Sequence, residues 1–216
     1  MFVPAMYREP DARWISELIR RHPLALLMTN GGDEDGPFGT HLPIITDPRQ
    51  PAADPAGLIG STLAGHMNRA NPQWKAMRSG MPAVLSFSGP NGYVSPAHYE
   101  FGPAAPTWNY TAVQLRGVVE PIDSHDETLS VVSATSATLE AEFGGGWDQA
   151  ESIGHFLRIL PGVGAFRFTV TCAESIFKLS QEQKSDARER VCRHFQEADG
   201  AHRGVAEYMN RLTEAK

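Results

Sequence analysis

The sequence has few cysteines and no long hydrophobic run, and both features narrow what the protein can be. Its 216 residues include two cysteines, Cys172 and Cys192, which form neither a CxxC pair nor a CxxCH motif. Two unpatterned cysteines favour a reducing cytoplasm. The apolar run LALLM is too short to cross a bilayer, and MFVPAMYREP lacks the basic-then-apolar order of a signal peptide. We therefore expect a cytoplasmic protein without a membrane segment.

The sequence also lacks an excess of positive charge. Lys and Arg total 19 against 25 Asp and Glu, for a net charge of −6. Broad contact with DNA phosphates needs a basic face, so we expect no nucleic-acid partner. The strongest opposing feature is a predicted helix with Lys184, Arg188, Arg190 and Arg193. Arginines at helical spacing are more often a solvated face.

Several catalytic and nucleotide-binding motifs are missing as well. There is no GxGxxG after a strand and no P-loop, which argues against dinucleotide and nucleoside triphosphate sites. The histidines show no HExxH spacing, and no serine sits in a nucleophile elbow. Zinc-protease and serine-hydrolase chemistry therefore have no support.

What the sequence does contain is a series of strand patterns with helices placed between them. Its length fits a single domain, residues 1–216, with a helical C-terminal tail from roughly 184 to 216. PLALLMTN and PFGTHLPIITD, separated by GGDEDG, predict a hairpin. Further strands are predicted in GLIGSTLAG, PAVLSFSG continuing into NGYVSP, TWNYTAVQLRGVVEPI and VGAFRFTVT. Helices are predicted after Asp11, after Ser124 as far as GGG, and after Asp148. The order predicts a mainly β fold with added helices (α+β), a β-barrel whose ligand sits at its mouth or against a partner subunit.

The stretch GHMNRANPQW, residues 65–74, concentrates residues that could bind a cofactor. His66 is expected at a strand-to-helix junction, with the Asn-Pro pair ending a short turn or helix. A histidine there more often caps a strand end, but Arg69, Asn71 and Trp74 add an anion clamp, an amide and an aromatic wall. A cofactor with carboxylates or a phosphate needs that mixture, and a single imidazole suffices for haem iron. Met67 is more readily core filler than a ligand.

Other candidates have competing structural explanations. His41, in THLPI, is slightly better explained as a barrel-interior histidine bonded to a neighbouring strand than as a substrate contact. Trp108 is equally consistent with core and with a pocket wall. Lys178 could be a solvated lysine at a strand end, or Lys178, Ser180 and Gln181 together could bind an acid group at the barrel rim. The remaining histidines are expected to be structural or solvated.

Five motifs, THLP, GHMNRANPQW, GYVSP, PTWNYTAV and FKLSQ, occur in this order between residues 40 and 181. In this respect the chain resembles the PaiB-type family, described as FMN-binding negative transcriptional regulators. The resemblance implies an FMN-binding-type split β-barrel, a homodimer, and a cofactor held between the subunits.

Within that family the chain is most similar to the actinobacterial piperazate synthases, through MFVPAMY, APTWNYTAVQLRG, LPGVGAFR and FKLSQEQ. This likeness implies a haem b enzyme that closes N5-hydroxy-L-ornithine into L-piperazic acid by forming an N–N bond with loss of water. The amine could attack directly or through an iron-bound nitrenoid. The reaction is redox-neutral, so no NAD(P)H site is required.

The resemblance also implies roles for individual residues. His66 would be the axial iron ligand, and Arg69 and Lys178 would pair with the haem propionates. Asn109 and His41 are the leading candidates for substrate contact. Trp74, Tyr93 and Trp108 would line the pocket, and the cofactor-binding set is completed by Asn71, Ser95 and Gln181. If the cofactor is FMN instead, Arg69 and Lys178 would hold its phosphate, and the protein would be a regulator or a flavin oxidoreductase.

Overall fold

A computed structural model describes residues 1–8, 11–31, 36–50, 57–100, 102–198 and 200–214. The chain forms two compact units. Unit 1 comprises residues 1–11, 88–113 and 174–216, and unit 2 comprises residues 12–87 and 114–173. The single domain over residues 1–216 stays a prediction.

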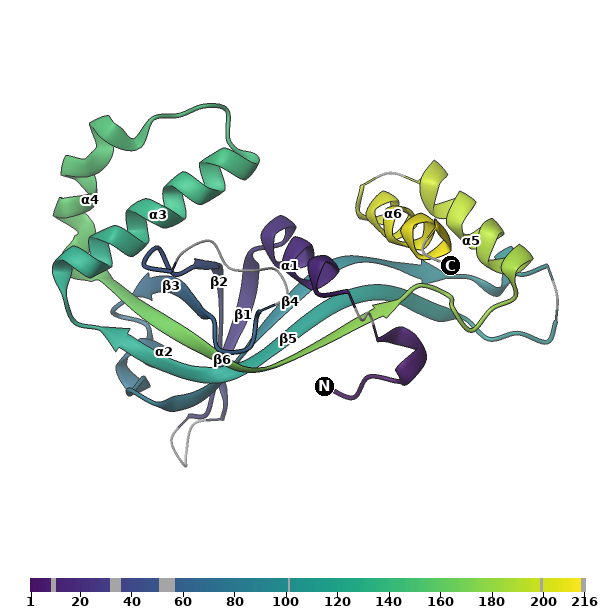
Figure 1. Ribbon diagram of the computed structural model, residues 1–216, viewed down its shortest axis with the longest axis horizontal. Coiled ribbons are helices and arrows are strands. Elements are labelled where there is room, and N and C mark those ends of the chain that lie inside the picture. The colour runs from purple at the N-terminus through teal and green to yellow at the C-terminus, as the bar shows by residue number, and fades with distance from the viewer. Residues whose placement is uncertain (9–10, 32–35, 51–56, 101, 199, 215–216) are drawn as a thin grey trace. The chain divides into compact units, whose positions relative to one another are not determined.

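Six strands close into a barrel in the order β1-β2-β3-β6-β5-β4 (Figure 1). They are β1 (Leu24–Thr29), β2 (Phe38–Thr46), β3 (Thr62–Asn68), β4 (Met81–Val94), β5 (Thr107–Ile122) and β6 (Val163–Lys178). The predicted hairpin is confirmed, because β1 and β2 are antiparallel with Leu24 opposite Pro43 and Thr29 opposite Phe38. Residues 32–35 of its predicted turn, and 51–56 of the following loop, lie outside the described residues. The mainly β barrel with added helices is confirmed.

Side-chain caps mark the start of some of the helices. The main helices are α1 (Ala12–Arg21), α2 (Pro72–Ala76), α3 (His125–Phe143), α4 (Ile153–Ile159), α5 (Ser185–Glu197) and α6 (Ala201–Glu214). The Ser124 hydroxyl accepts a hydrogen bond from the Glu127 backbone N–H and caps α3, which ends at Gly144. Asp148 caps a 3-10 turn, Gln149–Ser152, and α4 follows directly. Phe143 of α3 and Leu157 of α4 are 57% and 52% exposed.

The barrel interior is filled by alternate residues of each strand. A Cβ added to Gly65 of β3 would come within 2.8 Å of Leu42, Ile44 and Phe166. These side chains therefore occupy the space that a side chain at position 65 would need, which places Gly65 on the inner face. Its neighbours Ala64 and His66 consequently belong to the outer face.

Helix α3 covers part of that outer face. Its Val131 packs with Ile45, Ala64, Ile122 and Ala165 in one buried cluster. Burial of these aliphatic side chains drives α3 onto the barrel. Figure 1 shows α3 and α4 together beside the strands of unit 2.

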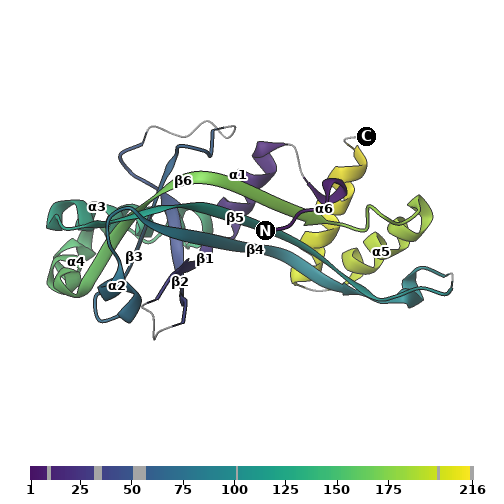
Figure 2. The same ribbon diagram turned by 90° about the horizontal axis from the view of Figure 1, so that it is seen from below.

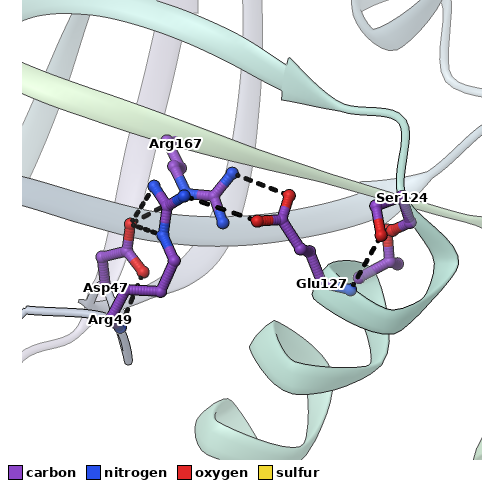
Figure 3. A network of polar contacts seen from close by, with 6 residues as sticks. Asp47, Arg49, Ser124, Glu127 and Arg167 are labelled. Atoms are coloured by element: carbon purple, nitrogen blue, oxygen red, sulfur yellow. Dashed lines mark hydrogen bonds and ion pairs between the residues drawn. The ribbon is translucent and has the colours of Figure 1, made fainter.

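A polar network fixes the position of α3 on the barrel (Figure 3). The Asp47 carboxylate accepts a hydrogen bond from Arg167 Nε at 2.9 Å and from Arg49 Nη2 at 3.1 Å. Glu127 of α3 accepts from Arg167 Nη1 and Arg49 Nη1. Asp47 is 1% and Arg167 is 7% exposed, so both charges are buried. Each compensates the free-energy cost of burying the other.

In unit 1, α5 and α6 pack against each other and against the far part of β4. A Cβ at Gly92 would lie 2.7 Å from Phe195 and 2.9 Å from His202. The rings of His98 and His194 stack with centroids 4.0 Å apart, so both histidines serve this packing. Figure 2 shows β4, β5 and β6 as long neighbouring strands.

Candidate functional site

His66 lies within strand β3 and not at the junction that the sequence predicted. It pairs with Ala165 of β6, and two further strand residues follow it. The Asn-Pro pair begins α2 instead of ending a turn, because Asn71 is the N-cap and Pro72 the first helical residue. Proline is favoured at that position because its fixed φ suits a helix start. His66 is therefore held by a paired strand on the outer face of the barrel.

The imidazole of His66 has an unusual environment. Its Nδ1 is buried and has no hydrogen-bond partner, and none of the described hydrogen bonds involves the other ring nitrogen. Burial lowers the pKa of His66 below the usual 6.5, so the ring is neutral at physiological pH. A buried nitrogen without a partner costs free energy unless a bound group satisfies it. A neutral imidazole is the form that binds a metal.

Asn71 has a structural task that accounts for both ends of its amide. Its Oδ1 accepts a hydrogen bond from the Gln73 backbone N–H at 2.9 Å, which caps α2. Its Nδ2 donates to Thr40 Oγ1 at 3.0 Å, which ties the start of α2 to β2. The predicted contact between Asn71 and a cofactor stays a prediction, and neither of these two hydrogen bonds supports it.

Arg69 and Trp74 form a stacked pair at the end of the barrel. Arg69 Nε donates to the Val163 carbonyl oxygen at 2.8 Å, and its guanidinium lies 5.5 Å from the centre of the Trp74 ring. The indole rests on Gly164, where an added Cβ would come within 2.4 Å of it. Within the described residues, no ion pair joins Arg69 to a carboxylate. Its remaining donors can therefore serve an anion.

His41 is exposed, and the barrel-interior position that the sequence favoured is wrong. It lies on β2 opposite Leu26, while its neighbour Leu42 is 3% exposed and faces the interior. Alternation along the strand explains this, since adjacent side chains point to opposite faces. The proposed substrate contact of His41 stays a prediction.

Tyr93 and Trp108 form an exposed aromatic pair in unit 1. Each is 49% exposed, and their ring centroids are 6.0 Å apart at an interplanar angle of 58°. Trp108 Nε1 donates to Asn91 Oδ1 at 3.2 Å, which fixes the orientation of the indole. Trp108 is thus not a core residue, and the predicted place of Tyr93 and Trp108 in a pocket wall stays a prediction.

Lys178 is held by neighbours from its own unit. Its ammonium donates to Thr107 Oγ1 and lies 5.8 Å from the centre of the Tyr7 ring. Tyr7 donates its hydroxyl proton to Glu182 at 3.2 Å. Burial, followed by the charge and hydrogen bond of Glu182, raises the pKa of Tyr7 to about 12. Tyr7 and Glu182 were not singled out from the sequence, because their contact spans 175 positions.

Three further predicted residues shape the backbone of unit 1. Asn109 is fully buried and exchanges hydrogen bonds with Ser180, at 2.9 and 3.3 Å. Gln181 accepts from the Leu179 backbone N–H and donates to the Phe177 carbonyl oxygen, bracing the turn where Ser180 has a φ of +62°. Ser95 caps the short 3-10 helix Pro96–His98. Their predicted ligand roles stay predictions.

The predicted site residues therefore fall into two groups. His41, His66, Arg69, Asn71 and Trp74 belong to unit 2, and the rest of the set belongs to unit 1: Tyr93, Ser95, Trp108, Asn109, Lys178 and Gln181. The residues that hold these side chains, including Thr40, Asn91 and Gly164, were not predicted as site residues. Of the three, Gly164 had a signal in the sequence, because a glycine inside a strand often marks a place where another group lies close to the backbone.

Residues 1–172 match a protein-family model described as "Putative FMN-binding domain". The chain belongs to this family. It is 25% identical over 229 residues to an uncharacterized protein of Emericella nidulans, covering 91% of this chain and 90% of that protein. The fold is similar to that of an FAD and haem binding protein from Mycobacterium smegmatis, with a TM-score of 0.55 and 16% identity over 85% of this chain and 78% of the other. It is also similar to the flavocytochrome Anf3 from Azotobacter vinelandii, with a TM-score of 0.51 and 15% identity over 79% and 67% of the two chains.

No helix among the described residues has the length and apolarity needed to cross a membrane. Within the same part of the chain, no three His, Cys, Asp or Glu side chains converge to hold a metal ion.

Proposed function

We propose that the protein binds haem b through His66 and acts as a piperazate synthase on N5-hydroxy-L-ornithine. The observation that carries the proposal is the His66 imidazole, which burial keeps neutral and whose buried Nδ1 lacks a partner. Structural tasks account for Asn71, and in large part for Arg69 and Trp74, but not for His66. A role as the axial ligand of haem iron would explain why His66 is there.

The family supports a prosthetic group of this size. Its model is named for FMN binding, and two proteins of similar fold are named as an FAD and haem binding protein and a flavocytochrome. The likeness of GHMNRANPQW, APTWNYTAVQLRG and FKLSQEQ to piperazate synthases favours haem over flavin for this chain.

The described residues fit haem in two respects. His66 supplies one partly exposed imidazole on the outer face of the barrel. Arg69, braced by Val163 and Trp74, offers guanidinium donors for a propionate. When bound, haem would supply a Lewis-acidic iron for the hydroxylamine group.

The remaining work falls to the protein and to the substrate itself. Loss of water requires a proton on the hydroxylamine oxygen, and the α-amine then forms the new bond to N5. The substrate equals the product plus water, so no electron source is needed. A pocket that holds the flexible substrate in a coiled conformation would bring its α-amine close to N5, in a near-attack geometry. Exposed His41 is the proposed substrate contact in unit 2.

The second candidate is an FMN protein, either a flavin oxidoreductase or a regulator. The family description favours it, and Arg69 suits a phosphate as well as a propionate. The regulator form is weakened by the geometry of α5. Arg190 donates to the carbonyl oxygens of His98 and Tyr99, so one of the arginines available for DNA is used inside unit 1.

Two measurements decide between the candidates. The absorption spectrum of protein produced with a haem precursor should show a Soret band and no stoichiometric flavin. The haem-loaded protein should then convert N5-hydroxy-L-ornithine into a product lighter by one water, identified as L-piperazic acid by mass and chromatography, without added reductant. Lactam or unchanged substrate, together with FMN-loaded protein that reduces a test acceptor, would replace this proposal by the flavin one.

A further inference from the structure

A cavity of about 330 Å³ lies in unit 2, between the C-terminal half of α3 and the loop that follows it. Its apolar lining includes Ala137 and Ala141, and its polar lining includes Glu140, Asp148 and Gln149. Trp147 forms a wall and is 50% exposed. The volume is at the lower end of small-molecule pockets.

The loop is built around the carboxylate of Glu140. Its Oε1 accepts hydrogen bonds from the backbone N–H groups of Gly146 at 2.9 Å and Trp147 at 2.7 Å. Gly144 must lack a side chain, since a Cβ there would overlap the carboxylate. Gly146 has a φ of +91°, which glycine adopts without strain. These contacts fix Trp147 and Glu140 relative to each other.

The cavity presents hydrogen-bond acceptors and negative charge. Two carboxylates line it, and no lysine, arginine or histidine does among the residues that the structure describes. The carbonyl oxygen of Gln149, Oε1, is buried without a hydrogen-bond partner. Among the described residues no cation stacks on Trp147. An anion would be repelled here, and a neutral apolar molecule would leave the buried oxygen unsatisfied.

We propose that this cavity binds a small organic cation, a primary ammonium group on a short hydrocarbon chain. The ammonium donates to Glu140 and to Gln149 Oε1, and the chain lies on the Trp147 indole and the two alanines. Charge-assisted hydrogen bonds and a cation–π contact then act together. The site is independent of His66 and of the proposed haem.

The probe is n-butylammonium chloride, titrated into ¹⁵N-labelled protein at constant ionic strength. Four tryptophans give four indole N–H signals, and the Trp147 signal is the one lost in Trp147→Leu. We expect n-butylammonium to shift that signal saturably and to leave the signal of buried Trp14 in place. Butan-1-ol and butyrate, with the same chain, should shift it far less.

Glu140→Gln keeps the oxygen that accepts from the loop and removes the charge, so we expect affinity to fall about tenfold or more. Glu151→Gln, an exposed carboxylate outside the lining, is the matched control and should leave affinity unchanged. His66→Ala should also bind normally. If Glu140→Gln shifts the NMR signals of the loop residues in the absence of n-butylammonium, Gln149→Leu is used as the test variant in its place, and it should weaken binding. Equal binding of butan-1-ol, or equal losses in Glu140→Gln and Glu151→Gln, would overturn the proposal.

Discussion

At the scale of single residues, His66 stands apart because the fold does not account for it. Buried polar atoms are nearly always paired. In GHMNRANPQW, Asn71 caps a helix and Arg69 donates to a carbonyl oxygen. Two buried atoms of the stretch have no partner, His66 Nδ1 and Gln73 Oε1, but the Gln73 side chain is held by donating to the Leu27 carbonyl oxygen and to Thr29, whereas no hydrogen bond of the described residues holds the His66 ring.

We expect His66→Ala to abolish the Soret band of the haem-loaded protein or shift it strongly, because the iron would lose its protein ligand. His41→Ala removes an exposed imidazole from the same unit and should leave the band in place. Absorption spectra of the two purified variants, with circular dichroism to verify folding, provide the comparison. The reverse pattern would transfer the ligand role to His41.

The lowered pKa of His66 predicts a pH dependence of cofactor-free protein. With a folded-state pKa below the usual 6.5, the unfolded chain binds more protons between the two values. Stability is therefore complete above about pH 6.5 and falls as the pH drops toward the folded-state pKa. Thermal melts from pH 8 to pH 5 should show a smaller decline in His66→Gln. Parallel declines would remove His66 as the cause.

At the scale of elements, the buried ion pair of Asp47 and Arg167 joins the end of β2 to β6, and Glu127 of α3 contacts the same arginine (Figure 3). Burial alone would raise the pKa of the Asp47 carboxyl, but hydrogen bonds from Arg49 and Arg167 outweigh it and hold that pKa below its usual value. The contribution of Asp47 to stability is therefore present above its unfolded pKa and lost as the pH falls through the folded one.

Asp47→Asn should destabilise the protein by about 3 kcal/mol, because it leaves the buried Arg167 guanidinium without its main carboxylate. Glu127→Gln removes a carboxylate that is 42% exposed, and about 1 kcal/mol or less should be lost. Urea unfolding of both variants at pH 7 measures the difference. Similar losses would show that the network is not organised around Asp47.

Helix α2 depends on a close contact with the barrel. Gly164→Ala would drive a methyl group into the Trp74 indole and should cost about 1–3 kcal/mol. Gly162→Ala, two residues earlier, faces open space and is the control. Melting temperatures compare the two. An unchanged melting temperature in Gly164→Ala would mean that α2 can move without cost.

At the scale of the whole molecule, the outer face that carries His66 is the surface where a partner could complete a site. We propose that a second copy of this chain covers the cofactor, as the resemblance to the FMN-binding split-barrel family implies. Light scattering should give the mass of a dimer for haem-loaded protein. A haem-loaded monomer would contradict the proposal directly.

The sequence by itself determined the elements that short-range chemistry specifies. Strand alternation in TWNYTAVQLRGVVEPI predicted β5 residue for residue, and Ser124 with Glu127 predicted the start of α3. The ordered motifs predicted the family, which the match over residues 1–172 confirms. His66 was also singled out from its neighbours, although its position within β3 was not.

Only the tertiary structure decided which side chains are engaged in contacts within the protein and which are left to bind a ligand. His41 and Leu42 are adjacent in sequence, yet strand pairing exposes one and buries the other. Trp74 and Gly164, or Tyr7 and Glu182, meet across long stretches of chain, and no local pattern encodes such contacts. The missing partner of His66 Nδ1 is likewise a property of everything packed around it, because burial removes water and the fold supplies no substitute.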